Sequence, residues 1–398
     1  MKTPQTIAVL GLGHLGSAIA TRLAEQGQNV VGWTRSGRRV GAAGTAMEVD
    51  IAGDASEAVE KADVVLLCLF DGSACIQVLD QVRDSLKADA VVLNTSTIAP
   101  AEAAELAQRF GSNYVHVPVL GSVRAVAAGE LRLLAAVDDA GSLSFDKVRP
   151  VLEVLGTVLR VKDAATAAAL KLIANSSLAG AVLALRDALQ QAEALGLSRD
   201  EALDVLELGQ LGGLAARKRG FLTQPPTASV TGEAEFTIGA LAKDMALLAD
   251  ASPKPVPSAA ELADSAGVAS ADIATAVTAP AVDDAVLEPL HAYIRGHATG
   301  DAAHFRDAFL ASAHVEGMRD GAFVSWQLEE YCSIFSGQPA ADEASRTRRI
   351  DSVRVHGTVA SASMTLHHGA NTFTDMFLLT RGEGGEWRIA NKAYHRHS

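Results

Sequence analysis

Three glycines near the start of the chain have the spacing of a phosphate-binding turn, G-x-G-x-x-G, at Gly11, Gly13 and Gly16. An apolar run over 7–10 precedes them as a buried strand, and a helical pattern over 17–26 and a second strand over 29–33 follow. The first glycine permits a tight turn, the second admits a pyrophosphate to the backbone, and the third lets helix and strand pack closely. The free N–H groups at the helix start would hold the phosphates. We therefore predict a dinucleotide site built from Gly11, Leu12, Gly13, His14, Leu15 and Gly16.

The residues after the second strand indicate which dinucleotide binds. An NAD site usually has an acidic residue there, which accepts hydrogen bonds from the ribose. Positions 30–40 contain none and instead carry Thr34, Arg35, Ser36, Arg38 and Arg39. An arginine fork matches a phosphate dianion, and a serine hydroxyl can add a donor. We predict NADPH rather than NADH; the alternative is a glycine-rich turn beside an ordinary basic loop.

Lys171 and Asn175 form a second chemical pair. They are four residues apart in a segment rich in Ala, Leu and Ile, so they share one face of a helix. Burial lowers the pKa of an amine from about 10.4. Such an amine can give a proton to a carbonyl oxygen, or take one from an alcohol, near neutral pH. Asn175 would orient the substrate or the amine; the alternative is that Lys171 extends along the helix edge to water.

Two further segments carry polar side chains that a ligand would meet. Residues 94–100, Asn-Thr-Ser-Thr-Ile-Ala-Pro, follow a predicted strand at the sheet edge where α/β proteins bind ligands. Ser96 and Thr97 would hold a substrate carboxylate there, or the segment serves only to cap the helix near Pro100. The segment 236–244, with Lys243 and Asp244, reads on its own as a helix with an exposed charged pair.

The predicted elements around these side chains divide the first 278 residues into two parts. Strands and helices alternate at first, which predicts a parallel sheet covered by helices. The predicted strands cover 62–70, 90–94, 114–119 and 131–137, and the predicted helices lie near 73–85 and after 100. One long helix over 164–194 follows, with further helices near 199–208 and 238–251 and a loop over 222–235. We predict a Rossmann dinucleotide-binding domain over 1–163 and an all-helical substrate and dimerisation domain over 164–278.

The last part of the chain has a different pattern. Amphipathic helices are predicted over 283–297 and 326–335. Alternating residues then predict strands over 360–366, 372–380 and 387–394. Helices followed by an antiparallel sheet form an α+β domain, which we place at 283–398 after a linker near 278–281.

Composition limits the partners and the compartment. The 398 residues are 48 % hydrophobic and 20 % charged, with a net charge of −13, which argues against nucleic acid as a partner. The three cysteines have no metal-ligand spacing and suit a reducing compartment, so we predict no metal site. We also find no apolar stretch long enough to cross a bilayer, and we expect a cytoplasmic protein without a membrane partner.

The order of the motifs GLGHLG, WTRS, NTSTIAP, GSVRAVAAGEL, LKLIANSSLAG and FTIGALAKD resembles the β-hydroxyacid dehydrogenase family over about residues 5–278. That family contains 3-hydroxyisobutyrate dehydrogenases and glyoxylate or tartronate-semialdehyde reductases. The resemblance implies a small-molecule substrate and a homodimer paired through the long helix. It implies Lys171 as the catalytic acid/base and Lys243 as a residue that closes over the cofactor, beside Asp244. The remaining implied residues are Ser96, Thr97, Gly121, Ser122 and Asn175 at the substrate, and Leu69, Phe70 and Thr95 at the cofactor.

The sequence departs from this family at three positions. Leu120-Gly121-Ser122 stands where the family usually has Ser-Gly-Gly, so the serine that normally touches substrate is replaced by Leu120. His116 stands in place of an aspartate, and Asp187 where glutamate is common. A less polar or bulkier substrate than a small hydroxy acid suits Leu120 better.

The C-terminal segments HAYIRGHATGDAAHFRDAF, HVEGMRDG and FTDMFLLTRGEGGEWRIANKAYH resemble the NTF2-like, SnoaL-like α+β cone family. The resemblance implies a conical pocket that acts as an active site, a binding site or only a dimer contact. Candidates to line it are Tyr293, His314, Trp326, Tyr331 and Asp375. No acid/base pair stands out there, and an accessory or dimerising module is the alternative. His395 and His397 near the end have no carboxylate cluster to support a metal.

These observations favour an NADPH-dependent oxidoreductase that moves a hydride between nicotinamide and a carbonyl or alcohol carbon, with Lys171 as acid/base. Imine reductases share the architecture and also favour NADPH, but they usually lack the catalytic lysine, so Lys171 argues against that alternative. A third possibility is a non-catalytic NADPH-binding regulator that recognises its ligand in the C-terminal cone.

Overall fold

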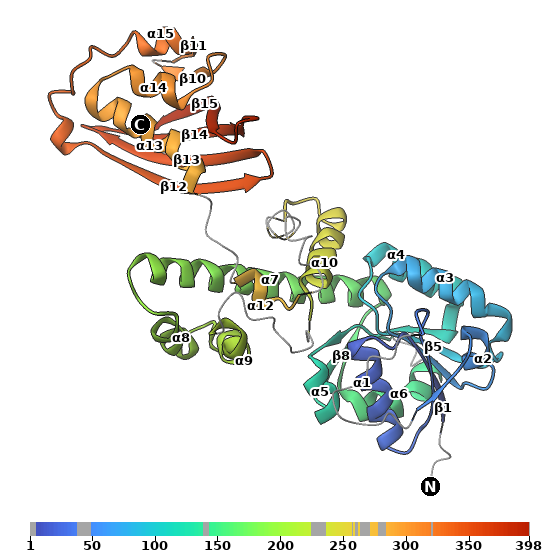
Figure 1. Cartoon of the computed structure of the whole chain (residues 1–398). Coiled ribbons are helices and arrows are strands. Elements are labelled where there is room, and N and C mark those ends of the chain that lie inside the picture. The colour runs from blue at the N-terminus through green and yellow to red at the C-terminus, as the bar shows by residue number, and fades with distance from the viewer. Residues whose placement is uncertain are drawn as a thin grey trace. The chain divides into compact units, whose positions relative to one another are not determined.

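The apolar runs of the N-terminal part, blue to green in Figure 1, form a six-stranded parallel sheet in the computed structural model. Its strand order is β3-β2-β1-β4-β5-β6. Its strands are β1 (Thr6–Leu10), β2 (Asn29–Trp33), β3 (Asp50–Ile51), β4 (Val64–Leu67), β5 (Val91–Asn94) and β6 (Tyr114–His116). The central strand β4 is buried along its whole length, as expected for a parallel strand covered on both faces. The predicted Rossmann sheet is confirmed.

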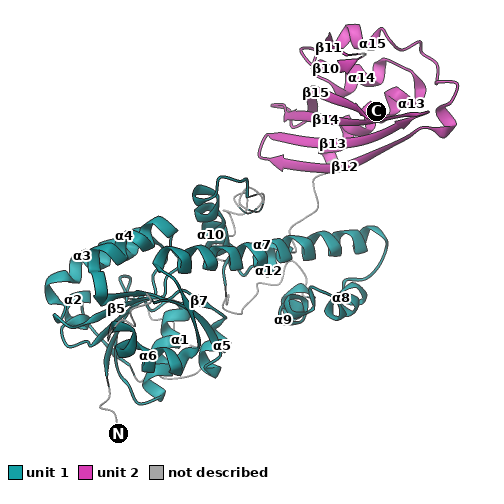
Figure 2. Ribbon diagram, turned by 180° about the vertical axis from the view of Figure 1, so that it is seen from behind, with its two compact units in different colours: residues 1–279 teal, residues 280–398 magenta. Residues whose placement is uncertain are grey.

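The structure describes residues 5–37, 49–137, 143–223, 236–256, 258, 262, 271–277, 284–319 and 321–397. These residues belong to two units, Met1–Ala279 and Pro280–Ser398, which Figure 2 colours separately. Arg38, Arg39, most of the predicted loop over 222–235 and the predicted linker near 278–281 lie outside the described residues.

Helices cover both faces of the first sheet because alternate strand residues point to opposite sides. Ile7 and Val9 enter an apolar core with the helices on one face, whereas Ala8 and Leu10 enter a second core on the other face. The first core is shared with α1 (His14–Glu25), α5 (Val123–Ala128) and α6 (Leu143–Leu155). The second is shared with α2 (Ala55–Val59), α3 (Gly72–Val82) and α4 (Pro100–Phe110). Short 3₁₀ turns, η1 (Arg83–Ser85) and η2 (Gly111–Asn113), follow α3 and α4.

A separate three-stranded sheet lies beside the main one, with order β7-β8-β9. Its strands are β7 (Val119–Leu120), β8 (Leu131–Ala136) and β9 (Gly156–Val161). The sequence correctly predicted a strand at β8 but not β9, whose residues are mostly exposed or half-buried and carry little apolar signal. Because β7 follows β6 closely, this small sheet places Leu120 near the end of the main sheet.

The long helix α7 (Ala164–Ala194) has the predicted bounds. It begins where the Asp163 side chain accepts a hydrogen bond from the backbone N–H of Thr166. It packs against α4, α8 (Arg199–Leu208), α9 (Gly212–Leu222), α10 (Ile238–Ala251) and α12 (Ala274–Val277). The sheet and helical parts of this unit therefore meet along α7, and a domain boundary at residue 163 remains a prediction.

One expectation about α7 is wrong. By length and composition α7 is apolar enough to cross a membrane, although the sequence was expected to contain no such stretch. Its buried residues Val182, Leu185 and Leu189 instead pack in an apolar core shared with α9, α10 and α12. A core helix of this kind passes the same test of length and hydropathy.

The second unit is an α+β domain built on a six-stranded sheet of order β11-β10-β15-β14-β13-β12. The strands are β10 (His314–Arg319), β11 (Ala322–Gln327), β12 (Thr347–His356), β13 (Val359–His368), β14 (Asn371–Arg381) and β15 (Trp387–His397). One face of this sheet packs on helical segments and encloses the core. These segments are η4 (Asp284–Val286), α13 (Glu288–Thr299), α14 (Ala303–Ala308) and α15 (Leu328–Cys332), with η5 (Glu343–Ser345) preceding β12. The predicted α+β class is confirmed.

The helix predicted over 326–335 is shorter than expected. Trp326 belongs to β11, where it pairs with Val315 of β10, and the helix α15 covers only Leu328–Cys332. The Glu330 carboxylate accepts a hydrogen bond from the backbone N–H of Gln327, which sets the start of this helix after the strand. The apolar residues at 324 and 326 fit both a strand and a helix, so their pattern alone does not separate the two.

Candidate active site

The glycine turn after β1 leaves its backbone open in front of helix α1. Gly11 has φ +106°, and a Cβ there would collide with the carbonyl oxygen of Cys68. A Cβ at Gly16 would collide with the carbonyl oxygen of Gly11, whereas a Cβ at Gly13 would meet no described atom within 4 Å. Gly13 is also the N-cap of α1, so open space adjoins the free N–H groups of a 12-residue helix. This arrangement fits the pyrophosphate of a dinucleotide.

The predicted phosphate-recognition residues lie at the same end of the sheet. Gly11 donates a backbone hydrogen bond of 2.9 Å to the carbonyl oxygen of Trp33, the last residue of β2. Thr34, Arg35 and Ser36 follow directly, and Arg35 and Ser36 are exposed. The backbone that carries Arg35 and Ser36 therefore lies next to the glycine turn, where a ribose phosphate would need a guanidinium and a hydroxyl.

Hydroxyl groups hold together the loops that follow β4 and β5. Ser96 Oγ accepts a 2.9 Å hydrogen bond from the backbone N–H of Leu69, and Thr95 Oγ1 donates at 2.7 Å to the carbonyl oxygen of Leu67. Both side chains are buried, whereas Thr97 is half-buried and Phe70 is 60 % exposed. The helix α4 is capped by Glu102, which accepts from the N–H of Ala99, rather than by Ser96 or Thr97. The buried Ser96 and Thr95 side chains therefore hold the ends of β4 and β5 together. Thr97 and Phe70 are more exposed, so a ligand at the carboxyl edge of the sheet could contact them.

Three side chains from α7 and α10 form a hydrogen-bonded chain. Lys171 Nζ donates to Asn175 Oδ1 at 3.1 Å, and Asn175 Nδ2 donates to Asp244 Oδ2 at 2.5 Å. Asn175 and Asp244 are 5 % and 2 % exposed. The predicted pair Lys171 and Asn175 does share one helix face, and that face is turned inward against α10.

The surroundings adjust the acidity of the Lys171 amine. Burial lowers its pKa to about 8, the Asp244 carboxylate opposes this shift, and the Lys243 ammonium adds to it. Near neutral pH both protonation states of such an amine are therefore accessible. A lysine that merely extended to water along the helix edge would keep its ordinary pKa.

Lys243 fastens α10 to the two strand-end loops. Its ammonium donates to the carbonyl oxygens of Phe70 at 2.9 Å and Thr97 at 2.8 Å, and it lies 2.8 Å from Asp244 Oδ1. It also sits 5.3 Å from the centre of the Phe70 ring. The predicted residues Phe70, Thr97, Lys171, Asn175 and Lys243 are thus brought together at the carboxyl edge of the sheet.

The β7 turn completes this edge. The half-buried Leu120 ends β7, which packs against α7. Gly121 follows with φ +139°, and a Cβ there would lie 2.7 Å from a Leu131 methyl carbon, so a glycine is needed. Ser122 is the N-cap of α5, but its side chain makes no capping hydrogen bond there. An apolar side chain therefore stands where the family usually offers a serine hydroxyl.

The other two departures from the family lie away from the hydrogen-bonded chain. His116 is fully buried beside the hydroxyl of Tyr114 at 3.3 Å, and burial lowers its pKa to about 3, so it stays neutral. Asp187 pairs with its neighbour Arg186 at 3.0 Å on an exposed part of α7. Neither side chain contacts Lys171, Asn175 or Asp244 through any hydrogen bond of the described residues.

The segment 236–244, read on its own, predicted that Lys243 and Asp244 form an exposed charged pair. For Asp244 this prediction is wrong, because its side chain is buried. The buried residues of α10 are Ile238, Leu241, Asp244 and Met245, so Asp244 occupies the apolar stripe of its helix. A carboxylate at such a position requires a buried partner. That helical spacing is the signal that could have identified Asp244 as a buried carboxylate in need of a partner.

Two family models and several known proteins match parts of this chain. Residues 6–167 match the family described as "NAD binding domain of 6-phosphogluconate dehydrogenase", and residues 281–395 match the family described as "Putative lumazine-binding". A "Probable 3-hydroxyisobutyrate dehydrogenase" of Mycobacterium tuberculosis is 31 % identical over 205 residues, which are 50 % of this chain and 68 % of that protein.

Two further relatives extend the comparison. The 2-(hydroxymethyl)glutarate dehydrogenase of Eubacterium barkeri is 25 % identical over 207 residues, 50 % of this chain and 67 % of that protein. The solved structure of the Mycobacterium tuberculosis 3-hydroxyisobutyrate dehydrogenase with L-serine has a TM-score of 0.57 and 26 % identity, and covers 69 % of this chain and 99 % of its own. Together with the glycine turn and the strand-end site, these matches show that the chain belongs to the β-hydroxyacid dehydrogenase family, and that its C-terminal α+β domain is similar to the family described as "Putative lumazine-binding".

Proposed function

We propose that this protein is an NADPH-dependent oxidoreductase in which Lys171 is the acid/base for a carbonyl or alcohol substrate. The observation that carries the proposal is the Lys171–Asn175–Asp244 chain. It holds an amine with a pKa of about 8 at the carboxyl edge of a dinucleotide-binding sheet. Family membership supports a nicotinamide cofactor, and the residues after β2 favour its phosphorylated form.

The described residues fit this cofactor along the edge of the sheet. The turn from Gly11 to Gly16 would hold the pyrophosphate, and Arg35 and Ser36 the ribose phosphate. The cofactor, when bound, supplies or accepts the hydride. Its nicotinamide half would meet the residues that line the strand-end loops, namely Leu69, Phe70, Thr95 and Lys243.

The protein's own contribution is to hold the substrate and manage one proton. In the reductive direction, protonated Lys171 gives a proton to the substrate oxygen; in the oxidative direction, the neutral amine takes it back. Asn175 Oδ1 accepts from the amine and so limits its orientations. Thr97, Gly121 and Ser122 would contact the rest of the substrate, with Ser96 supporting the loop behind them.

The substrate class follows from Leu120. The relatives named above are dehydrogenases of 3-hydroxyisobutyrate and 2-(hydroxymethyl)glutarate. Leu120 presents a half-buried apolar side chain at this edge, so we propose a carbonyl or alcohol substrate with a larger apolar portion than those acids.

We also propose that the protein acts as a homodimer paired along α7. Leu170 and Ile173 of this helix are 43 % and 58 % exposed, and contiguous exposed apolar side chains favour an interface.

A substrate screen that follows NADPH oxidation tests the function. The panel contains short and branched aldehyde acids, larger apolar ketones and cyclic imines. Turnover of aldehydes or ketones supports the proposal. Turnover of imines alone favours an imine reductase, and tight NADPH binding without any turnover favours a regulator.

A further inference from the structure

The concave side of the sheet in the second unit carries polar groups that the proposed oxidoreductase chemistry does not use. Lys392 Nζ on β15 donates to Asp375 Oδ2 at 2.7 Å and to Tyr293 Oη at 2.6 Å. The Tyr293 hydroxyl donates to the same Asp375 oxygen at 2.6 Å. The side chains of Lys392 and Asp375 are 5 % and 2 % exposed. A complete ion pair is therefore buried between two strands and α13.

Further titratable groups continue from this pair. The Tyr331 hydroxyl lies 3.4 Å from the Tyr293 hydroxyl and 2.8 Å from His297 Nε2. The His297 ring lies 5.3 Å from the ring of His368. We call these six residues the Lys392 cluster: Tyr293, His297, Tyr331, His368, Asp375 and Lys392. It runs from β15 across β14 and α13 to the end of β13.

Fold stability does not explain the Lys392 cluster. On the same strands, Phe377, Met364 and Ala362 fill the core with apolar side chains that are almost completely buried. Burying an ion pair costs desolvation energy, and well-packed apolar residues of similar volume often stabilise a core as much or more. The polar groups therefore point to a role beyond packing.

Hydrogen-bond donors beside the Lys392 cluster are unsatisfied. Arg348 binds Glu343 through both terminal nitrogens at 2.6 and 2.9 Å, but its Nε has no partner among the described residues. His368 Nε2 is buried and likewise has no hydrogen-bond partner in the described part of the chain. The Arg348 side chain is only 4 % exposed. Arg348 Nε, and His368 Nε2 in the tautomer that carries its proton there, are therefore buried donors without an acceptor among the described residues.

Arg348 and His368 interact electrostatically, so a single carboxylate, with its two acceptor oxygens, suits both donors. Burial and the nearby guanidinium of Arg348 lower the pKa of His368 to about 4, so its ring is neutral and carries one N–H. Burial lowers the pKa of His297 well below its usual range, and the nearby cations Lys392 and Arg348 add to this shift. A carboxylate that accepts from Arg348 Nε and His368 Nε2 would lie beside two existing ion pairs, Arg348–Glu343 and Lys392–Asp375.

Aromatic rings surround the same region. Phe335 lies 5.2 Å from the ring of His297, and Phe373 lies 5.9 Å from the ring of His368. Trp326 stacks on Tyr394 with ring centres 6.2 Å apart and planes 4° apart. Phe335, Phe373 and Trp326 are half-buried, so solvent reaches this rim. Flat apolar walls next to hydrogen-bond donors suit a flat apolar ligand with a carboxylate at one end.

We propose that the concave side of the second unit binds an aromatic carboxylate. Its carboxylate accepts hydrogen bonds from Arg348 Nε and His368 Nε2, and its ring lies among Phe335, Phe373 and Trp326. The Lys392–Asp375 pair positions Tyr293 and, through Tyr331, His297. This site does not depend on the function proposed for the first unit.

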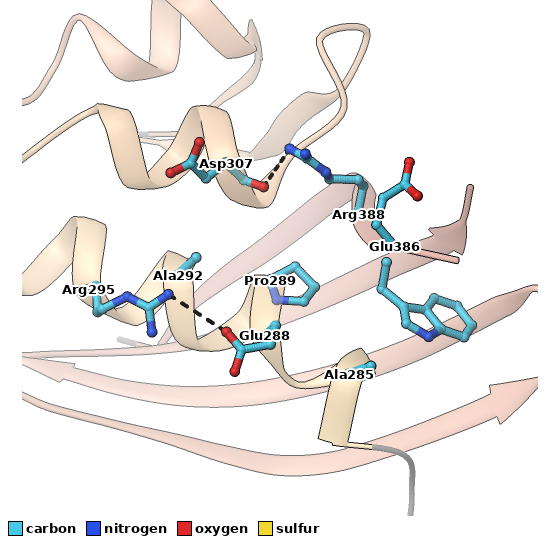
Figure 3. Close-up of a pocket in the computed structure, with 9 residues that line it drawn as sticks. Ala285, Glu288, Pro289, Ala292, Arg295, Asp307, Glu386 and Arg388 are labelled. Carbon is cyan, nitrogen blue, oxygen red and sulfur yellow. Dashed lines mark hydrogen bonds and ion pairs between the residues drawn. The ribbon is translucent and has the colours of Figure 1, made fainter. Parts of the chain in front are cut away.

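A groove elsewhere in this unit is the competing location. It has a volume of about 330 Å³ and lies between α13, the end of α14 and the start of β15 (Figure 3). Its charged lining has three carboxylates, Glu288, Asp307 and Glu386, against the two guanidinium groups of Arg295 and Arg388. Arg388 already donates to the carbonyl oxygen of Asp307 at 2.6 Å, and Arg295 lies 3.9 Å from Glu288. This lining disfavours an anion.

Calorimetric titration of benzoate into the full chain tests the proposal. We expect benzoate to bind saturably at one site of the unmodified protein. The substitution His368→Phe should weaken this binding by at least about tenfold, because it removes a hydrogen bond to a charged group, which contributes about 1.5–3 kcal/mol. This substitution leaves the Lys392–Asp375 pair intact, and an unchanged melting temperature shows that the variant is folded. His395→Phe, on the exposed outer face of β15, is the matched control and retains binding.

Further variants separate the outcomes. Lys392→Met and Arg348→Met should also weaken benzoate binding, whereas Arg295→Gln in the groove should not. The proposal is overturned if the full chain does not bind benzoate, or if binding survives His368→Phe and Arg348→Met unchanged. Loss of binding in Arg295→Gln alone would assign the ligand to the groove instead.

Discussion

Asn175 donates from its amide nitrogen to Asp244 Oδ2 at 2.5 Å and accepts at its amide oxygen from Lys171 at 3.1 Å. Because an ionised carboxylate only accepts hydrogen bonds, the NH₂ end of the amide must face Asp244. The amide oxygen is then left to face the Lys171 amine. One buried carboxylate therefore fixes the orientation of the amide and raises the pKa of Lys171 against the effect of burial.

Replacing Asp244 by Asn should move the pH profile of reduction to lower pH. The substitution removes the negative charge that raises the pKa of Lys171, so the protonated amine is lost at a lower pH, by about one unit. The measurement is kcat against pH with NADPH and a carbonyl substrate. Asp250→Asn, on the exposed side of α10, is the control and should keep the original profile. An unchanged profile in Asp244→Asn would show that this carboxylate does not act on Lys171.

The unmodified protein should show opposite pH dependence in the two directions. Reduction needs protonated Lys171 and should fall as the pH rises through about 8, whereas oxidation needs the neutral amine and should rise there. The folded state also binds this proton less tightly than the unfolded chain. Stability from this group should therefore increase with pH between about 8 and the unfolded value of about 10.4. Denaturant unfolding of the protein and of Lys171→Met across this range measures the difference, and parallel curves would contradict the assignment.

Replacing Arg35 by Ala should weaken NADPH much more than NADH. The guanidinium is proposed to contact only the ribose phosphate, and such a charged hydrogen bond contributes about 1.5–3 kcal/mol, or roughly ten- to a hundredfold in affinity. Fluorescence titration with both cofactors checks this, with the exposed Arg83→Ala as control. Equal losses for the two cofactors would remove Arg35 from phosphate recognition.

Replacing Leu120 by Ser should shift substrate preference toward small hydroxy acids. The substitution restores a hydroxyl at the position where the family usually has one and removes an apolar contact. We expect kcat/KM to rise for 3-hydroxyisobutyrate and to fall for the best apolar substrate, each by about tenfold. If both values fall together, Leu120 supports the β7 turn rather than selecting the substrate.

The sequence predicted features that depend on neighbouring residues, but it did not predict contacts between residues that are far apart in the chain. The bounds of α7 were predictable because Asp163 supplies a cap at its start and an Ala- and Leu-rich run continues to residue 194. The Lys171–Asn175 pair was predictable because helix geometry alone brings residues four apart together. Helix capping and residue spacing of this kind act between near neighbours in the chain, so they can be recognised in the sequence.

The missed relationships join distant residues. Asp375 and Lys392 meet through the register of a β14–β15 hairpin that contains an irregularity between Leu378 and Leu379, so their contact does not follow from their spacing. Asp244 lies 69 positions from Asn175, on a different helix. Polar residues on apolar stripes were the available signal in both cases, but that signal does not name the partner.

Replacing Lys171 by Met is the most direct test of the proposed acid/base, because it removes the amine while keeping a long apolar side chain. We expect kcat to fall by about 10²–10⁴-fold, the usual contribution of a positioned acid or base. The affinity for NADPH should change less than about twofold, which is about 0.4 kcal/mol. The exposed Lys61→Met serves as control and should keep full activity. Undiminished turnover by Lys171→Met on the protein's best substrate would contradict the account.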